Sequence, residues 1–186
     1  MAWWLSRGPG ERQFADLREP RFTRMSGQRM LVVEATGDPT VVSGGAIKLL
    51  FNTYFKLKGV SRVGRPPAPR ARWRFSLDTP REKWAGQYAL PVPDSVAEVP
   101  AEPAGPMRVT IATWEYGDVA EVLHVGPYSA ERPDIDRLHA FIASNGYRAV
   151  GDHEEEYVKG PGMIFAGDPG AYLTIIRLRV EKSPAQ

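Results

Sequence analysis

A short segment near the carboxyl end of the chain carries side chains suited to ionic or acid–base chemistry. It reads His153-Glu154-Glu155-Glu156-Tyr157-Val158. Alternation along a strand places His153, Glu155 and Tyr157 on one face and the other three residues on the opposite face. A carboxylate beside a tyrosine hydroxyl attracts a cation or accepts a proton from water. Three adjacent glutamates are also typical of a solvated edge strand, and whether Glu155 or Glu156 faces inward stays open.

The preceding residues predict the elements that position this segment. Glu121 to Val125 is an apolar run closed by Gly126-Pro127-Tyr128, which indicates a strand entering a turn. Pro133 and Asp134 favour the first turn of a helix, and Asn145-Gly146 favours its end. Between them, the spacing of the apolar residues forms one stripe, made of Ile135, Leu138, Phe141 and Ile142.

These phrases together resemble the GyrI-like domain, a small-molecule-binding module. The matching phrases are the strand end Leu123 to Tyr128, the helix core Arg137 to Ile142, the pair Gly146-Tyr147, and the pattern His-x-Glu-x-Tyr at 153–157. The resemblance covers the last third of the chain strongly and the first half faintly. The same domain forms the effector half of multidrug-sensing transcription regulators. No helix-turn-helix is expected before Met30, so direct DNA binding is not expected either.

The first half of the chain repeats the order of elements seen in the second. A strand from Met30 to Ala35 precedes the corner Gly37-Asp38-Pro39, and a helix is expected from about Gly44 to Lys58. Gly37 and Gly126 lie 89 residues apart (126 − 37). Further strands are expected at Arg70 to Leu77 and Gly86 to Val92, and one near Arg21 to Arg24.

The repeat and the resemblance predict an α+β fold. Duplicated β-α-β-β units would form an antiparallel sheet with two helices on one face and a ligand cleft at the repeat junction. The boundaries expected are a mobile tail at 1–16, a first repeat at 17–99, a proline-rich linker at 100–108 and a second repeat at 109–182.

Composition limits the classes of function. The chain has 186 residues with 42% hydrophobic content and a net charge of +2, with no cysteine and three histidines without zinc spacing. No metal or other cofactor is therefore expected. Arginines cluster only at 62–74, so nucleic-acid binding is not expected. No apolar run reaches the length of a membrane span, and the expected location is the cytoplasm.

The resemblance implies an aromatic pocket with a glutamate at its base. The residues expected to contact ligand are Glu155, Tyr157, His153, Trp73, Trp84, Tyr88, Trp114, Tyr116 and Phe165. His124, within an apolar strand, is expected to be a core residue. Aromatic faces beside a carboxylate suit lipophilic, preferably cationic, aromatic compounds, so the function expected is a stand-alone small-molecule-binding protein.

A hydrolase is the alternative. Some stand-alone members of the family open the cyclopropane ring of DNA-alkylating natural products by adding water. Glu155 would then act as the base, and Tyr157 or Tyr88 would donate a proton to the developing oxyanion. A third function, inhibition of gyrase, rests on the family name alone.

Overall fold

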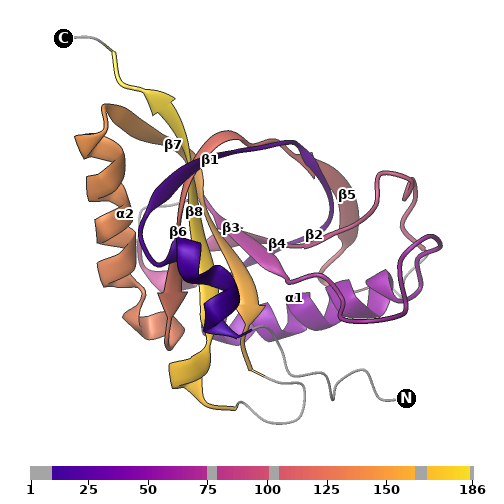
Figure 1. The fold of residues 1–186 in the computed structure, drawn as a ribbon. Coiled ribbons are helices and arrows are strands. Elements are labelled where there is room, and N and C mark those ends of the chain that lie inside the picture. The colour runs from indigo at the N-terminus through magenta and orange to yellow at the C-terminus, as the bar shows by residue number, and fades with distance from the viewer. Residues whose placement is uncertain (1–9, 75–78, 101–104, 162–166, 185–186) are drawn as a thin grey trace. The chain divides into compact units, whose positions relative to one another are not determined.

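The computed structural model describes residues 10–74, 79–100, 105–161 and 167–184, and it is an α+β protein. The described chain divides into two compact units. Unit 1 comprises residues 27–100 and 105–115 without 75–78, and unit 2 comprises 10–26 and the described part of 116–184. Figure 1 labels the strands and α-helices of both.

Unit 1 is a four-stranded antiparallel sheet with one α-helix. Its strands run in the order β3-β4-β2-β5. The elements are β2 (Gln28–Thr36), α1 (Pro39–Tyr54), β3 (Arg70–Trp73), the short 3₁₀ helix η3 (Arg81–Lys83), β4 (Ala85–Pro91) and β5 (Val109–Trp114).

Unit 2 is likewise a four-stranded antiparallel sheet with one α-helix. Its strands run in the order β1-β6-β8-β7, all antiparallel. The elements are the 3₁₀ helix η2 (Glu11–Leu17), β1 (Arg21–Met25), β6 (Gly117–Val125), η4 (Tyr128–Ala130), α2 (Arg132–Ser144), β7 (Tyr147–Lys159), η5 (Pro169–Ala171) and β8 (Leu173–Lys182).

The corner between strand and helix is built the same way in both units. Gly37 and Gly126 adopt φ values of 134° and 139°, a conformation that favours glycine. Their backbone N–H groups donate to the carbonyl oxygens of Trp84 and Tyr172, at 2.8 and 3.1 Å. The predicted α+β class, with duplicated strand–helix units and antiparallel pairing, is therefore confirmed.

The structure differs from the sequence-based expectation at several boundaries. Helix α1 begins at Pro39 rather than near Gly44, because Asp38 caps it by accepting a hydrogen bond from the Thr40 N–H at 2.8 Å. Residues 11–17 form η2, with Leu17 buried, where a tail was expected. Strand β1 pairs in unit 2 and β5 pairs in unit 1. The division into two consecutive repeats and the cleft at their junction stay predictions.

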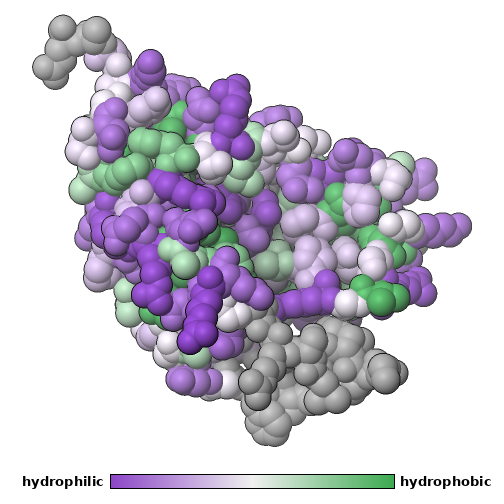
Figure 2. Space-filling model, in the orientation of Figure 1, coloured by the Kyte–Doolittle hydropathy of each residue, from purple (hydrophilic) through white to green (hydrophobic). Residues whose placement is uncertain are grey.

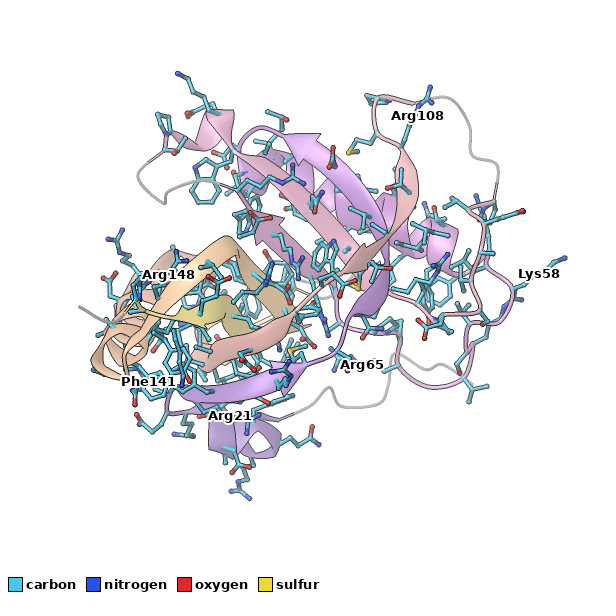
Figure 3. The ribbon with its side chains drawn as sticks, turned by 90° about the horizontal axis from the view of Figure 1, so that it is seen from above. Arg21, Lys58, Arg65, Arg108, Phe141 and Arg148 are labelled. Carbon is cyan, nitrogen blue, oxygen red and sulfur yellow. The ribbon has the colours of Figure 1, made fainter. Side chains whose placement is uncertain are left out.

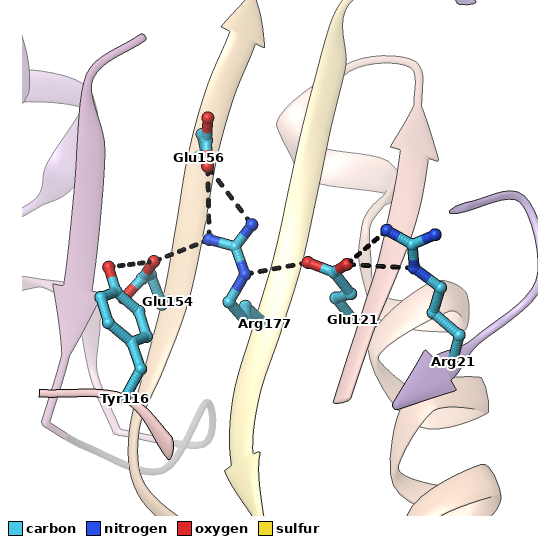
Figure 4. Close-up of polar contacts among 6 residues, drawn as sticks. All are labelled: Arg21, Tyr116, Glu121, Glu154, Glu156 and Arg177. Atoms are coloured by element: carbon cyan, nitrogen blue, oxygen red, sulfur yellow. Dashed lines mark hydrogen bonds and ion pairs between the residues drawn. The ribbon is translucent and has the colours of Figure 1, made fainter. Parts of the chain in front are cut away.

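A row of alternating charges crosses all four strands of unit 2. Arg21, Glu121, Arg177 and Glu154 are direct cross-strand partners on β1, β6, β8 and β7. Arg21 donates to Glu121 at 2.9 Å, and Arg177 donates to Glu121 at 3.0 Å and to Glu154 at 2.9 Å. Figure 4 shows this charge ladder. It ties each strand to the next in one register.

Two further side chains complete the ladder at β7. Tyr116 donates its hydroxyl to Glu154 at 3.0 Å, and Arg177 also reaches Glu156 at 3.3 Å. Burial lowers the pKa of Arg177, but the carboxylates of Glu156, Glu154 and Glu121 raise it more, so the net pKa lies above its ordinary value. The guanidinium group is therefore a permanent charge that holds three carboxylates.

The surface gives no sign of a membrane-spanning helix. The visible face in Figure 2 is mostly hydrophilic, with hydrophobic residues in small separate patches. Of the helices in the described ranges, none has the length and apolar character needed to cross a bilayer.

We expect Arg177→Met to lower the free energy of unfolding by about 3–5 kcal/mol, because it leaves buried carboxylates without their cation. The loss should shrink as the pH falls, since protonated carboxyl groups no longer need that cation. Urea denaturation measures both effects. The control is Arg148→Met, which removes the exposed Arg148–Glu181 pair (2.8 Å) and should cost less than about 1 kcal/mol. Equal losses in the two variants would contradict a stabilising ladder.

Candidate functional site

The face of unit 2 opposite the charge ladder carries the predicted acidic site. On β7, His153, Glu155 and Tyr157 lie across from Leu178, Ile176 and Thr174 of β8, which alternate along that strand. They therefore share one face, as alternation predicts. Helix α2 lies over this face: Phe22 contacts Phe141 of the helix with ring centroids 4.7 Å apart, and Phe22 belongs to the same cross-strand row as His153.

The carboxylate of Glu155 is buried and held by two neighbours from its own strand. The Tyr157 hydroxyl donates to Oε2 at 2.7 Å, and His153 Nε2 lies 3.1 Å from Oε1. The side chain of Glu155 is only 12% exposed. These contacts fix the position of the carboxylate, and they settle that Glu155 faces away from the ladder whereas Glu156 belongs to it.

Glu131 brings a second buried carboxyl group to the same site. It occupies the N-cap position of α2 but makes no side-chain capping bond, because its side chain turns inward. Burial raises the pKa of Glu131 to about 9, with help from the negative charge of Glu155 and against a lowering contribution from the Thr174 hydroxyl. At neutral pH the group is therefore a neutral acid beside a second carboxyl group.

Glu131 interacts with neighbouring polar groups, but one of its carboxyl oxygens lacks a hydrogen bond of standard geometry within the described chain. Its carboxyl group interacts with both Glu155 and Thr174. Yet Glu131 Oε1 and Thr174 Oγ1 are buried and, within the described chain, have no hydrogen bond of standard geometry. A buried polar atom without a hydrogen bond lowers the stability of the fold by about 1–3 kcal/mol. Such an atom in a native structure calls for an explanation, for example a functional role. Such a cost is typical of a functional site.

A cluster of three tyrosine rings meets the two carboxyl groups through Tyr128 and Tyr157. Tyr128 packs against Tyr157 and Tyr172, with centroid distances of 5.4 and 5.5 Å. Tyr128 is 39% exposed, so one part of this aromatic cluster reaches the surface. Burial and the charges of Glu131, Tyr172 and Glu155 raise the pKa of Tyr128 above its ordinary value. The ring is therefore neutral and can present an aromatic face to a ligand.

The chemistry of this cluster follows from its two carboxyl groups. A neutral acid and a carboxylate within reach of each other can donate and accept protons at the same time. Their negative charge also favours a cation, and the tyrosine faces favour an aromatic or alkylated one. Within the described ranges, no group of three or more His, Asp or Glu side chains is arranged to hold a metal ion.

Unit 1 holds an aromatic cluster made of three of the predicted site residues. Trp73 contacts Trp84 and Tyr88, with ring centroids 5.3 and 5.5 Å away. The Trp73 ring lies over Gly86, its cross-strand partner, where a Cβ atom would come within 2.5 Å of it. Trp73 Nε1 is buried, and no acceptor within the described chain bonds it. Trp84 Nε1 donates to the Thr79 carbonyl at 2.7 Å.

The remaining predicted residues do not join these clusters. Trp114 lies on the opposite face of the unit 1 sheet from Tyr88, with the Arg72 guanidinium 4.1 Å from its ring centroid. Tyr116 belongs to the charge ladder through Glu154. Phe165 lies outside the described residues. The site proposed below therefore omits all three. His124, expected in the core, is buried and bonds Asp134 of α2 at 2.8 Å.

The basic side chains of unit 1 differ in their exposure to solvent. Arg70 is buried, whereas Lys58, Arg65 and Arg108 are exposed, and Figure 3 shows Lys58 and Arg108 reaching outward from the ribbon. The expectations of no nucleic-acid binding and of a cytoplasmic location stay predictions.

Sequence reasoning missed Glu131, Thr174, Tyr128 and Tyr172 as site residues. Glu131 matched the preference of helix starts for acidic residues, which hid its inward orientation. Tyr172 had a signal that could have found it: it stands at the position in the second repeat that corresponds closely to Trp84 in the first, and both accept the N–H of the corner glycine.

Comparison with known proteins supports the fold. No protein-family model and no curated protein matches this sequence. An uncharacterized conserved protein from Listeria innocua superposes with a TM-score of 0.74 at 24% identity, over 92% of this chain and 96% of that one. A hydrolase from Listeria innocua gives 0.72 at 23% identity, with the same coverage of both chains.

A third solved structure extends the comparison. SAV2435 bound to tetraphenylphosphonium gives a TM-score of 0.52 at 13% identity, over 88% of this chain and 94% of that one. At these identities each likeness is one of fold alone. The set is consistent with a GyrI-like fold, and membership of that family stays a prediction.

The raised pKa of Glu131 makes the stability depend on pH. An acid whose folded pKa lies above its unfolded value stabilises the fold fully below the unfolded pKa, and that contribution disappears as the pH rises through the folded pKa. Between the unfolded value of 4.5 and the folded value of about 9, the unfolding free energy should therefore fall, by at most about 1.4 kcal/mol per pH unit. Urea denaturation across this range measures the slope.

The variant Glu131→Gln should flatten that slope, because a glutamine cannot release a proton. Asp136→Asn is the matched control, since Asp136 lies exposed on the same helix. It should retain the wild-type slope. A wild-type slope that persists in Glu131→Gln would contradict the assignment of the titrating group.

Proposed function

We propose that this chain is a small-molecule-binding protein for lipophilic, preferably cationic, aromatic compounds, with Glu155 as the charged group of the site. The observation that carries the proposal is a buried pair of carboxyl groups, Glu155 and Glu131, bordered by the partly exposed ring of Tyr128. The guanidinium group of Arg177 lies on the opposite face of the sheet and is already engaged by three carboxylates.

Physical chemistry links this arrangement to a cation. A buried carboxylate loses most of its hydration, and a cation of low hydration restores favourable electrostatics without itself losing much to desolvation. Aromatic rings add attraction through their negative faces, and they require little exact hydrogen bonding from the ligand. The fold likeness to SAV2435, whose structure contains tetraphenylphosphonium, supports the same class of ligand.

We expect Glu155→Gln to weaken binding of tetraphenylphosphonium by about tenfold or more, because loss of a buried charge contact of about 1.4 kcal/mol changes an equilibrium constant tenfold. Binding of neutral triphenylphosphine oxide should change by less than about threefold, since its aromatic contacts remain. Tryptophan and tyrosine fluorescence quenching measures both dissociation constants.

The control for this experiment is Glu156→Gln, the same change one residue along β7. Glu156 lies on the ladder face, so its replacement should leave both affinities near those of the wild type. An equal loss for the cation and the neutral compound in Glu155→Gln would overturn the electrostatic account.

Hydrolysis is the second candidate function. It is favoured by the pairing of a protonated acid, Glu131, with the carboxylate of Glu155. Water would attack a cyclopropane carbon while Glu155 accepts a proton from it. The electron pair of the breaking carbon–carbon bond would pass to a conjugated carbonyl oxygen, which takes a proton from Glu131 or Tyr157. Transfer of a proton from Glu155 to the group that donated one, Glu131 or Tyr157, would restore the site. The fold likeness to a hydrolase from Listeria innocua supports testing it.

Mass spectrometry distinguishes the two candidates. Incubation with a cyclopropane-containing alkylating compound should give a product heavier by one water if the chain is a hydrolase. The rate should fall by about a hundredfold in Glu155→Gln, the usual size of a lost general base. An intact compound, together with saturable tetraphenylphosphonium binding, would support the binding function and contradict the hydrolase.

A further inference from the structure

We propose that the site exchanges a proton for its cation: Glu131 and Glu155 hold one proton between them in the empty protein, and a lipophilic cation that binds beside Glu155 displaces it. This inference rests on the proposed binding function and deepens it, because it assigns Glu131 a role and predicts how pH regulates the site. It concerns unit 2 alone.

The geometry places both carboxyl groups in one enclosed environment. Glu155 is fixed by Tyr157 and His153 on β7, and Glu131 enters from the N-cap position of α2. Glu131 is only 5% exposed and Glu155 9%. Two carboxyl groups that interact directly and are both poorly hydrated cannot both be charged at moderate cost, so one proton remains with the pair.

The surroundings of the pair contain little positive charge that is independent of pH. Among the described residues, the groups that face it are His153 and Tyr157 from β7, Thr174 from β8, Tyr128 from η4 and Asp134 from α2. His124 of β6 lies in the same cross-strand row as Thr174 and 2.8 Å from Asp134. His139 of α2 interacts with His153, and burial lowers the pKa of His139. Asp134 raises the pKa of Glu131 further. The proton is therefore what keeps the charge of this cluster low.

A bound cation would keep the net charge of the cluster low in place of the proton. A positive charge within about 4–6 Å lowers the pKa of a carboxyl group by about 1–3 units. The pKa of Glu131, about 9 in the empty site, would then be lower in the complex. Near pH 8 the empty protein holds the proton and the complex does not. The N-terminus of α2 also favours the carboxylate that remains at Glu131.

Linkage requires the reciprocal effect on affinity. If cation binding releases a proton, raising the pH must strengthen cation binding by the same free energy. Between about pH 7 and 9, the dissociation constant of tetraphenylphosphonium should fall by about tenfold or more. This range lies above the titration of an unperturbed histidine and below that of an unperturbed tyrosine.

The test is isothermal titration of the whole chain with tetraphenylphosphonium at about pH 8, in two buffers with different ionisation enthalpies, which counts released protons. Wild type should release close to one proton per cation bound. Glu131→Gln should bind the cation and release none, with a dissociation constant that changes less than about twofold between pH 7 and 9. Asp136→Asn, exposed on the same helix, should behave as wild type.

A second measurement needs no variant. Infrared difference spectra of the wild type should lose the carbonyl stretch of a protonated carboxyl group when the cation is added. Cation binding without proton release, or with the carboxyl band intact, would overturn the exchange and leave the binding function standing. Proton release that persists in Glu131→Gln would also overturn it. No saturable binding at any pH would overturn the binding function and the exchange with it.

Discussion

The charge ladder of unit 2 is the interaction on which the site depends. Arg21, Glu121, Arg177 and Glu154 stand opposite one another on four strands, so each ion pair fixes the register of one strand against the next. A slip of one residue would move every side chain to the other face. The ladder thereby determines that Glu155, next to Glu154, points toward α2.

The two faces of β7 compensate their buried carboxyl groups in different ways. On the ladder face, Arg177 compensates Glu121, Glu154 and Glu156, and its charge does not depend on pH in the ordinary range. On the other face, a proton keeps Glu131 neutral, and Glu155 accepts a hydrogen bond from Tyr157. A guanidinium group is a fixed partner, whereas a proton can leave. Only the second arrangement can respond to a ligand.

Much of this architecture could be predicted from sequence because it depends on local rules. Alternation placed His153, Glu155 and Tyr157 on one face, and the corner glycines located both strand–helix connections. Glu131 escaped prediction because burial of a helix N-cap residue depends on the strands packed beneath it. The pairing of β1 with β6 also escaped, since strand partners far apart in sequence are set by the whole sheet and not by any local pattern.

The proton exchange and the hydrolysis use the same feature and differ in one geometric condition. Both need a carboxyl group that keeps its proton at neutral pH, which burial of Glu131 beside Glu155 supplies. The exchange uses the proton as a charge to be displaced by a cation. Hydrolysis uses it as an acid, and so requires a substrate oxygen within hydrogen-bonding distance while water reaches Glu155. A cation that displaces the proton would consequently inhibit hydrolysis by removing the acid as well as by occupying the site.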